Sequence, residues 1–225
     1  MSDALQPYDP ATYPPVGVTV DLVLMTVLKG QLGVLFQRRG QEPFAGQLAL
    51  PGSFVGPQED LDMAARRVLT DKVGMTEGWL EQLYSFGDPD RDPRMRIVSI
   101  AYFALLPADR LQAAVEGRED LLLLASAAAH ENPLAFDHGI ILALARERLQ
   151  GKLSHSPVAL ALLPDLFTLR DLQTVHEAIL ATTLNKPAFR RRMLDSGWIE
   201  GTGEREPVGP YRPAELYRRT DHRRP

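Results

Sequence analysis

The chain has 225 residues and a formal net charge of −4 at pH 7, with 44% hydrophobic and 24% charged residues; these values suit a globular protein of one large domain or two modest ones. It contains no cysteine, which excludes disulfide scaffolds and thiolate metal sites. No apolar run approaches the roughly 20 residues that span a bilayer, and the polar, Pro-rich start lacks the form of a secretory signal. We therefore expect a cytoplasmic protein with a flexible leader over residues 1–15 and no membrane partner.

The charge is distributed unevenly along the chain. Residues 1–185 carry 15 Lys/Arg and 23 Asp/Glu, for a net −8, whereas residues 186–225 carry 10 Lys/Arg and 6 Asp/Glu, for a net +4. An acidic body with a basic end is consistent with a second role on a polyanion. A solvated, frayed tail would show the same excess of basic residues.

The first part of the chain predicts a β-hairpin followed by a helix. Apolar residues alternate in "GVTVDLVLMTVL" (17–28), which predicts a strand, and "LGVLFQRR" (32–39) is typical of the returning strand. "PFAGQLALPGSFVGP" (43–57) predicts a loop, a short strand and a tight turn. From residue 61 the apolar residues recur at helical spacing, and Gly74 is suited to end that helix.

The middle of the chain continues the mixture of strands and helices. Two strands are predicted within 79–87 and 96–107, joined by the polar turn "DPDRDPRM", and a third within 120–126. Residues 136–153 form an amphipathic helical pattern. Residues 16–153 therefore predict one α+β domain.

The last part of the chain has a different pattern. Three helices are predicted within 156–164, 168–181 and 185–197, followed by a β-hairpin whose long tip is rich in Gly and Pro. Thr168 and Asp171 have capping-box spacing, and Asn185 is a suitable N-cap. Three helices and a hairpin predict a winged helix-turn-helix domain over residues 154–225.

One stretch carries a family resemblance. "ALPGSFVGPQEDLDMAARRVLTDKVGM" (49–75) resembles a Nudix box. The positions that match the motif are Glu59, Arg67, Leu69, Gly74 and Met75, while the leading glycine falls on Ser53. The resemblance implies a Nudix-type α/β/α sandwich with a mixed sheet. An unrelated amphipathic helix after a glycine turn would explain the apolar spacing but not the preceding strands and loop.

The metal-binding positions of the motif are degenerate. The glutamates that bind metal in the Nudix family fall on Val68, Asp71 and Lys72. Carboxylates at i, i+3 and i+4 share one helix face and can hold Mg²⁺, which activates water against a diphosphate. One carboxylate beside an ammonium cannot hold such a cation well. The sequence therefore predicts no catalytic residues, no required cofactor and no metal site, with Asp71 as the remaining ligand if a weak site survives.

The resemblance extends over most of the chain. A Nudix domain followed by a winged helix resembles the Nudix-related transcriptional regulators of NAD metabolism (NrtR-like) and their sugar-catabolism relatives, which are typically homodimers. The resemblance implies a ligand-responsive regulator, acting as a repressor of NAD or related nucleotide or sugar metabolism. Its partners would be ADP-ribose or a similar nucleotide as effector and double-stranded operator DNA.

Basic and aromatic residues are the candidates for effector binding, because a diphosphate needs positive charge when no metal is present. Lys72 would stand in for the cation, arginines at the strand ends would contact phosphate, and an aromatic ring would face adenine. The candidate ligand-binding residues are Arg38, Arg39, Phe44, Ser53, Glu59, Lys72, Arg94 and Arg96. Each cation can equally be an ordinary surface group, and Lys72 can pair with Glu59 or Asp71.

The third predicted helix of the C-terminal part is the candidate recognition helix. At about 100° per residue, Phe189, Met193 and Leu194 fall on one side, and Arg191 and Arg192 fall largely opposite. Cations in the wing suit phosphate contacts. The candidate DNA-binding residues are Lys186, Arg190, Arg191, Arg192, Arg205 and Arg212. A solvated basic face is the alternative.

Two other functions remain open from the sequence. The chain could be a Mg-dependent Nudix hydrolase of ADP-ribose-like nucleoside diphosphates, using carboxylates outside the box such as Glu81 or Glu131. It could also be an adaptor whose winged helix meets a partner protein. The five histidines are too scattered to form a recognisable metal site.

Overall fold

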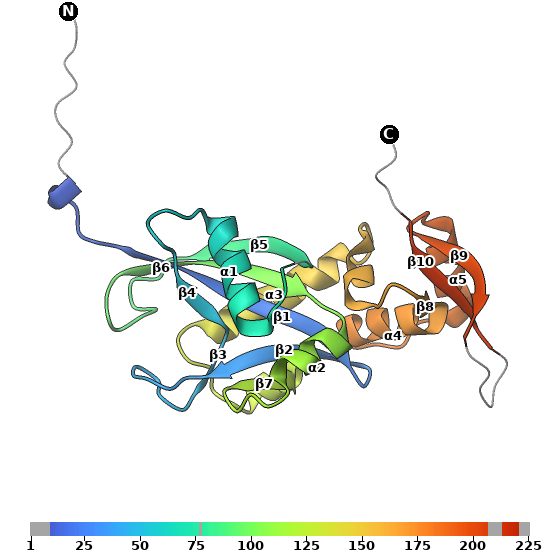
Figure 1. The fold of residues 1–225 in the computed structure, drawn as a ribbon, viewed down its shortest axis with the longest axis horizontal. Helices are drawn as coiled ribbons and strands as arrows, with labels where there is room; N and C mark the ends of the chain where they lie inside the picture. The colour runs from blue at the N-terminus through green and yellow to red at the C-terminus, as the bar shows by residue number, and fades with distance from the viewer. Residues whose placement is uncertain (1–9, 77, 207–212, 221–225) are drawn as a thin grey trace, which may run out of the picture.

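The computed structural model describes residues 10–76, 78–206 and 213–220. A mixed sheet lies at the centre of the larger part (Figure 1), with strands in the order β3-β2-β1-β6-β5, β4 paired with β1, and β7 paired with β2. Its strands are β1 (Gly17–Leu28), β2 (Gln31–Arg38), β3 (Leu48–Ala49), β4 (Gly52–Phe54), β5 (Trp79–Phe86), β6 (Ile97–Leu105) and β7 (Leu121–Ala125). β1 runs antiparallel to β2 and parallel to β6, so the sheet is mixed, as predicted.

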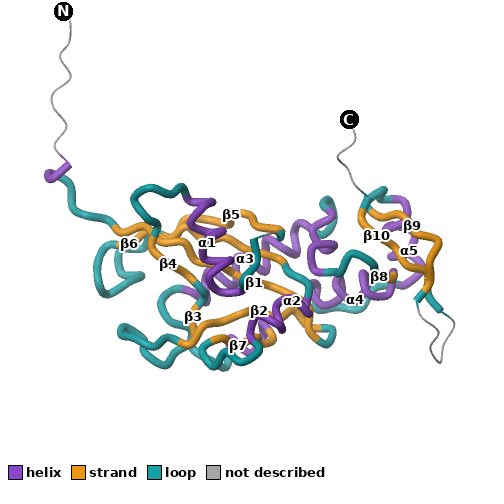
Figure 2. Tube along the Cα trace, in the orientation of Figure 1, coloured by secondary structure: helices purple, strands orange, loops and turns teal. Residues whose placement is uncertain are grey.

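Helices cover both faces of this sheet, and Figure 2 shows the strands lying between them. They are α1 (Leu61–Val73), α2 (Ala108–Val115) and α3 (His138–Lys152). Alternate residues of β1 enter opposite cores: Leu22 and Leu24 pack with α1 and α2, whereas Val23 and Met25 pack with α3. This arrangement confirms the α/β/α sandwich and places α1 and α3 on opposite sides of β1.

The ends of α1 follow from its flanking residues. Asp60 accepts a hydrogen bond from the Met63 amide at the N-terminus, and Gly74 adopts the left-handed conformation (φ 68°) at the C-terminus. The buried face of the helix consists of Ala64, Ala65, Val68, Leu69 and Val73. Val68, on which the family resemblance places the first metal ligand, therefore belongs to the apolar core beside α1.

The C-terminal elements form a winged helix-turn-helix that lies at one end of the molecule (Figure 1). They are η3 (Pro157–Leu162), β8 (Phe167–Thr168), α4 (Leu169–Leu180), α5 (Lys186–Asp195), β9 (Ile199–Arg205) and β10 (Glu215–Arg219), with β8, β10 and β9 in one small sheet. The capping box at Thr168 and Asp171 is present, and Asn185 caps α5 by accepting from the Ala188 amide. These local predictions are confirmed.

Three local predictions differ from the structure. Residues 157–162 form a 3₁₀ helix rather than an α-helix, because a six-residue segment that starts with proline can pack its apolar side chains without completing two α-turns. α2 and β8 were not predicted. Leu194 is 43% exposed and not packed with Phe189 and Met193, which are both buried.

The structure describes only part of the expected leader, and its described residues also bear on whether a helix spans a membrane. Of the expected leader, residues 1–9 lie outside the described residues, and Pro10–Thr12 forms the 3₁₀ helix η1. No helix in the described parts of the chain is long and apolar enough to cross a membrane.

Candidate functional site

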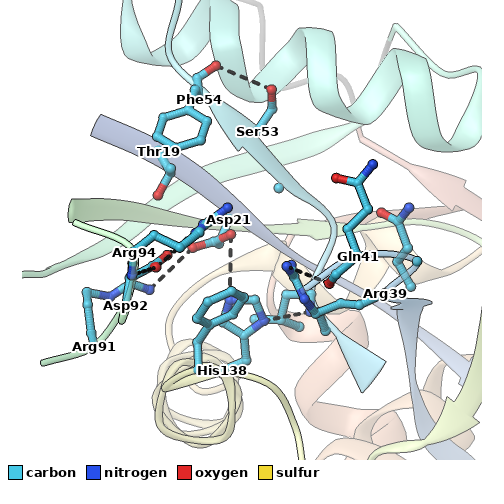
Figure 3. Close-up of a pocket in the computed structure, with 16 residues that line it drawn as sticks. Thr19, Asp21, Arg39, Gln41, Ser53, Phe54, Arg91, Asp92, Arg94 and His138 are labelled. Carbon is cyan, nitrogen blue, oxygen red and sulfur yellow. Dashed lines mark hydrogen bonds and ion pairs between the residues drawn. The ribbon is translucent and has the colours of Figure 1, made fainter. Parts of the chain in front are cut away.

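A cavity of about 420 Å³ opens on the α3 side of the sheet, where β1 meets the segments that lead into β3, β6 and α3. Figure 3 shows its charged side chains converging from these separate segments. The side chains and backbone that line it belong to Thr19, Asp21, Gln37, Arg39, Gly40, Gln41, Ala49, Leu50, Gly52, Ser53, Phe54, Arg91, Asp92, Arg94, Phe136 and His138. Three of the predicted ligand-binding residues are among them: Arg39, Ser53 and Arg94.

Two arginines converge beside one aromatic ring in this cavity. The guanidinium carbons of Arg39 and Arg94 lie 4.6 and 5.6 Å from the centroid of the Phe136 ring. Burial and the nearby charge of Arg94 lower the pKa of Arg39 below its ordinary value. Two like charges this close repel each other, so an anion placed between them would be stabilised by both.

Hydrogen bonds hold both guanidinium groups in place. Arg94 donates from Nε and Nη2 to the Asp92 carboxylate at 2.9 and 2.6 Å, and Arg39 donates from Nε to the Pro43 carbonyl at 2.7 Å. Phe44 does not line the cavity, but its ring packs edge-on against Phe136 with centroids 4.9 Å apart. Phe44 therefore supports the aromatic wall from behind.

The inner wall of the cavity is a buried polar network. Arg91 donates to both oxygens of Asp137 at 2.9 and 2.6 Å, and its Nη2 lies 3.6 Å from Asp21 Oδ2. Ser99 donates to the same Asp21 oxygen at 2.5 Å. His138, the first residue of α3, accepts at Nδ1 from the Leu50 amide at 2.8 Å. These groups fix one another and present a preorganised polar surface.

Glu59 does not line the cavity but supports it through hydrogen bonds with Arg67 and the Gly56 amide. Arg67 binds Glu59 at 2.6 Å, and it also donates to Ser53 Oγ at 3.3 Å and to the Phe54 carbonyl at 3.0 Å. The hydrogen bonds from Arg67 and from the Gly56 amide lower the pKa of Glu59 to about 2. The box residues Glu59 and Arg67 thus brace the loop that forms one side of the cavity.

Three other predicted ligand-binding residues lie away from the cavity lining. Arg38 donates to the Gly46 carbonyl at 2.9 Å, and Arg96 donates to the Asp88 carbonyl at 3.0 Å. Lys72 is half-buried on α1. The hydrogen bond from Arg118 lowers the pKa of the Asp120 carboxyl, and the charge of Lys72 makes a smaller contribution in the same direction. Among the described residues, Lys72 has no ion pair with Glu59 or Asp71.

The three positions on which the family resemblance places metal ligands differ in burial. Val68 is 1% exposed and lies in the core, while the Asp71 side chain is 60% exposed and lies 3.9 Å from Arg67. Within the described residues, no group of three or more potential metal ligands is present.

Sequence reasoning did not identify most of the inner wall. Thr19 and Asp21, Arg91, and Phe136 and His138 come from three stretches of the chain that lie far apart in the sequence. Asp21 was the one available sequence signal for this wall, since it is a lone carboxylate within an otherwise apolar strand pattern. Burying an unpaired charge is costly, so such a residue indicates a polar partner or a ligand.

The recognition-helix candidates are arranged on the surface of α5. Lys186, Arg190, Arg191 and Arg192 are all exposed, and the helix is anchored through the buried Phe189.

The cations of α5 and the wing have few strong partners. Arg191 lies 3.6 Å from Asp195, and Arg192 lies over the Phe189 ring at 5.5 Å. Arg205 is exposed at the end of β9, and Arg212 lies outside the described residues. Weakly paired cations on an anchored helix can be offered to phosphates or base edges at low cost.

Two family models match the two parts of the chain. Residues 16–144 match the model of the NUDIX domain, and residues 159–219 match that of the NrtR DNA-binding winged helix domain. The chain is 38% identical over 216 residues to the "ADPR responsive transcriptional repressor NtrR" of Acinetobacter baylyi, covering 95% of this chain and 86% of the relative.

Solved structures give the same assignment. Shewanella oneidensis NrtR complexed with a 27mer DNA is 34% identical with a TM-score of 0.81, covering 90% of this chain and 93% of that one. The NUDIX domain of the same protein complexed with ADP ribose is 35% identical with a TM-score of 0.57, covering 66% of this chain and 99% of that one. This chain belongs to the NrtR family of Nudix-related transcriptional regulators, with a Nudix domain followed by a DNA-binding winged helix.

Proposed function

We propose that this chain is a transcriptional repressor whose binding to operator DNA responds to ADP-ribose. The observation that carries the proposal is the cavity in which Arg39 and Arg94 converge beside Phe136, since a diphosphate would relieve the repulsion between the two guanidinium groups. The names of the relatives support the same effector and a DNA partner.

We assign effector binding to residues 16–153 and DNA binding to residues 154–225. Arg39, Ser53 and Arg94 would contact the effector directly. Phe44 and Glu59 would act through Phe136 and Arg67, while Arg38, Lys72 and Arg96 have no contact with the cavity. Lys186, Arg190, Arg191, Arg192 and Arg205, with Arg212 in the wing tip, would contact DNA. The expected working form is a cytoplasmic homodimer.

The proposal does not include Nudix hydrolysis. The three motif positions that would hold metal are a buried valine, an exposed aspartate and a half-buried lysine, which differ in burial as well as in chemistry. Mg²⁺ needs several oxygen ligands in near-octahedral geometry, and one exposed carboxylate does not supply them. ADP-ribose would accordingly be bound as an intact effector, with no cofactor required.

The test is a gel shift on the duplex upstream of the chain's own gene, titrated with and without ADP-ribose. The unliganded protein should shift this duplex with a strong salt dependence, and ADP-ribose should change the midpoint. A protein doubly substituted Arg191→Ala and Arg192→Ala should lose the shift, while Arg118→Ala, which removes a cation paired with Asp120 far from α5, should not. A DNA affinity that ADP-ribose leaves unchanged would contradict the proposal.

Hydrolysis is tested in the same preparation. ADP-ribose incubated with Mg²⁺ and the protein should be recovered intact, as followed by chromatography of the nucleotide. Rapid Mg²⁺-dependent release of AMP would instead favour the hydrolase.

A further inference from the structure

Three polar groups in residues that line the cavity have hydrogen-bonding capacity that the described residues leave unused. They belong to Thr19 and Asp21, two residues apart on the same face of β1, and to His138 at the start of α3 (Figure 3). We call Thr19, Asp21 and His138 the polar floor.

His138 offers a hydrogen-bond donor to the cavity. Its Nδ1 accepts from the Leu50 amide, which can only donate. Burial lowers the pKa of this imidazole below its ordinary value, so the ring is neutral and its single proton is on Nε2. Nε2 lies 3.8 Å from Asp21 Oδ1, too far for a hydrogen bond between them.

Asp21 offers an acceptor at the same place. Its Oδ2 is occupied by the Ser99 hydroxyl and the nearby Arg91 guanidinium, whereas no described residue donates a hydrogen bond to Oδ1. Gly52 lines the cavity beside it, and a Cβ at that position would collide with Asp21 Oδ1. The missing side chain at Gly52 leaves the space that the carboxylate needs.

Thr19 provides the third group. Its Oγ1 is buried and has no hydrogen-bond partner among the described residues, although the residue lines the cavity. An unsatisfied buried hydroxyl is costly. The Thr19 hydroxyl has almost no accessible surface, so the side chain would turn toward a ligand that bonds to it, and the bond would remove this cost.

We propose that the polar floor binds the hydroxyl groups of the effector's terminal ribose, with one hydroxyl donating to Asp21 Oδ1 and accepting from His138 Nε2, and a neighbouring hydroxyl bonding to Thr19 Oγ1. The inference rests on the proposed function, because it concerns the same effector. It adds the part of ADP-ribose that the floor recognises.

Charge and hydrogen-bonding capacity both favour a sugar at this position. The Asp21 carboxylate would repel a phosphate, which is better placed between Arg39 and Arg94. The aromatic walls, Phe54 and Phe136, lie beside those arginines, where a base can stack. A hydroxyl is both a donor and an acceptor, so it satisfies a carboxylate oxygen and an N–H at once.

The test compares the affinities for ADP-ribose and for ADP, which lacks the terminal ribose, by isothermal titration calorimetry on the full chain. Thr19→Val replaces the unpaired hydroxyl with a methyl group, so folding should be unaffected. This variant should bind ADP-ribose about tenfold more weakly, in the range of one lost hydrogen bond. Its affinity for ADP should remain within about twofold of the wild-type value.

Thr26→Val is the matched control. Thr26 lies on the same strand, its hydroxyl is likewise buried without a partner, and it is not part of the cavity lining. Both affinities of this variant should equal those of the wild type. Asp21→Asn, like Thr19→Val, should weaken the binding of ADP-ribose more than the binding of ADP.

Each other outcome has a distinct meaning. If the wild type binds ADP-ribose and Thr19→Val binds it equally well, the assignment of the terminal ribose to the polar floor is wrong, and the proposed function is unaffected. Equal losses for ADP-ribose and ADP would place the adenosine part at the floor and overturn the assignment to the terminal ribose. A wild-type protein that binds no ADP-ribose would overturn the proposed function, and the inference with it.

Discussion

His176 is a buried titratable residue in the DNA-binding part of the chain. It is 2% exposed, its Nδ1 has no partner among the described residues, and its ring packs edge-on against Phe189 at 5.0 Å. Burial, with a smaller contribution from the charge of Arg192, lowers the pKa of His176 to about 4. The neutral imidazole therefore behaves as an apolar anchor for α5.

Acid should destabilise the fold through this residue. Because the folded pKa is about 4 and the unfolded value is near 6.5, the unfolded chain binds the proton first as the pH falls through that window. The stability lost between pH 6.5 and 4 would amount to about 3 kcal/mol. Urea unfolding at pH 7 and pH 5 measures it, and His176→Leu should show a smaller difference between the two pH values. An unchanged difference in that variant would assign the acid sensitivity to other groups.

Val68 occupies the position at which the family resemblance places the first metal-binding glutamate, so a glutamate can be tested there. The side chain is 1% exposed among the apolar residues that join α1 to the sheet. Val68→Glu would bury a carboxylate with no partner, and we expect it to cost about 3–5 kcal/mol without creating Mg²⁺-dependent hydrolysis. Thermal unfolding and a nucleotide assay would measure both effects. Val68→Ala, which only leaves a small cavity, should cost about 1–3 kcal/mol; hydrolysis gained by Val68→Glu would contradict the interpretation.

Individual residues also mark the limit of what the sequence could predict about the site. Arg39 and Arg94 are predicted from their places at strand ends, and both line the cavity. Lys72 was selected from motif alignment, but helix geometry places it on the flank of α1 near Asp120. Asp21 and His138 meet only because β1 and α3 pack together, and no sequence spacing encodes that contact.

Local chemistry made α4 predictable. Thr168 Oγ1 accepts from the Asp171 amide at 3.1 Å, and the Asp171 carboxylate accepts from the Thr168 amide at 2.9 Å. Both bonds involve residues three apart, so their presence follows from the sequence alone. The glycine that ends α1 is likewise predictable from the sequence. The short α2 has neither a side-chain cap nor a long apolar stripe, so the sequence does not predict it.

The cap of α4 should be worth about 1 kcal/mol. Thr168→Ala removes the oxygen that accepts from the Asp171 amide, so the midpoint of urea unfolding should fall accordingly. Thr174→Ala is the control within the same helix, since its exposed hydroxyl only bonds back to the Arg170 carbonyl. Equal effects of the two substitutions would mean that the capping box does not stabilise the helix.

The apolar core of the whole molecule crosses the expected division near residue 154. One continuous cluster includes Met25 and Phe36 of the sheet, Leu149 of α3, and Leu172 and Phe189 of the winged helix. The family models match residues 16–144 and 159–219 separately, but the two parts share a core. A change at the sheet can reach the winged helix through packed side chains.

α3 extends from the cavity to the winged helix. His138 at its first turn belongs to the polar floor, and Gln150 near its end donates from Nε2 to the Ile179 carbonyl at 2.9 Å. Ile179 lies in the last turn of α4, where carbonyls lack partners within the helix. A small displacement of α3 by a ligand at His138 would therefore act on the end of α4.

Gln150→Leu should weaken the coupling between ADP-ribose and DNA while leaving ADP-ribose binding intact. The coupling is the ratio of DNA affinities measured with and without ADP-ribose, and removing the bond to Ile179 should bring that ratio closer to one. Fluorescence anisotropy on the upstream duplex gives the ratio, and calorimetry gives the affinity for ADP-ribose. Arg148→Ala is the control on the same helix, because Arg148 contacts β5 through Glu81 and the Leu83 carbonyl. A wild-type ratio in Gln150→Leu would mean that the signal passes through the shared core instead.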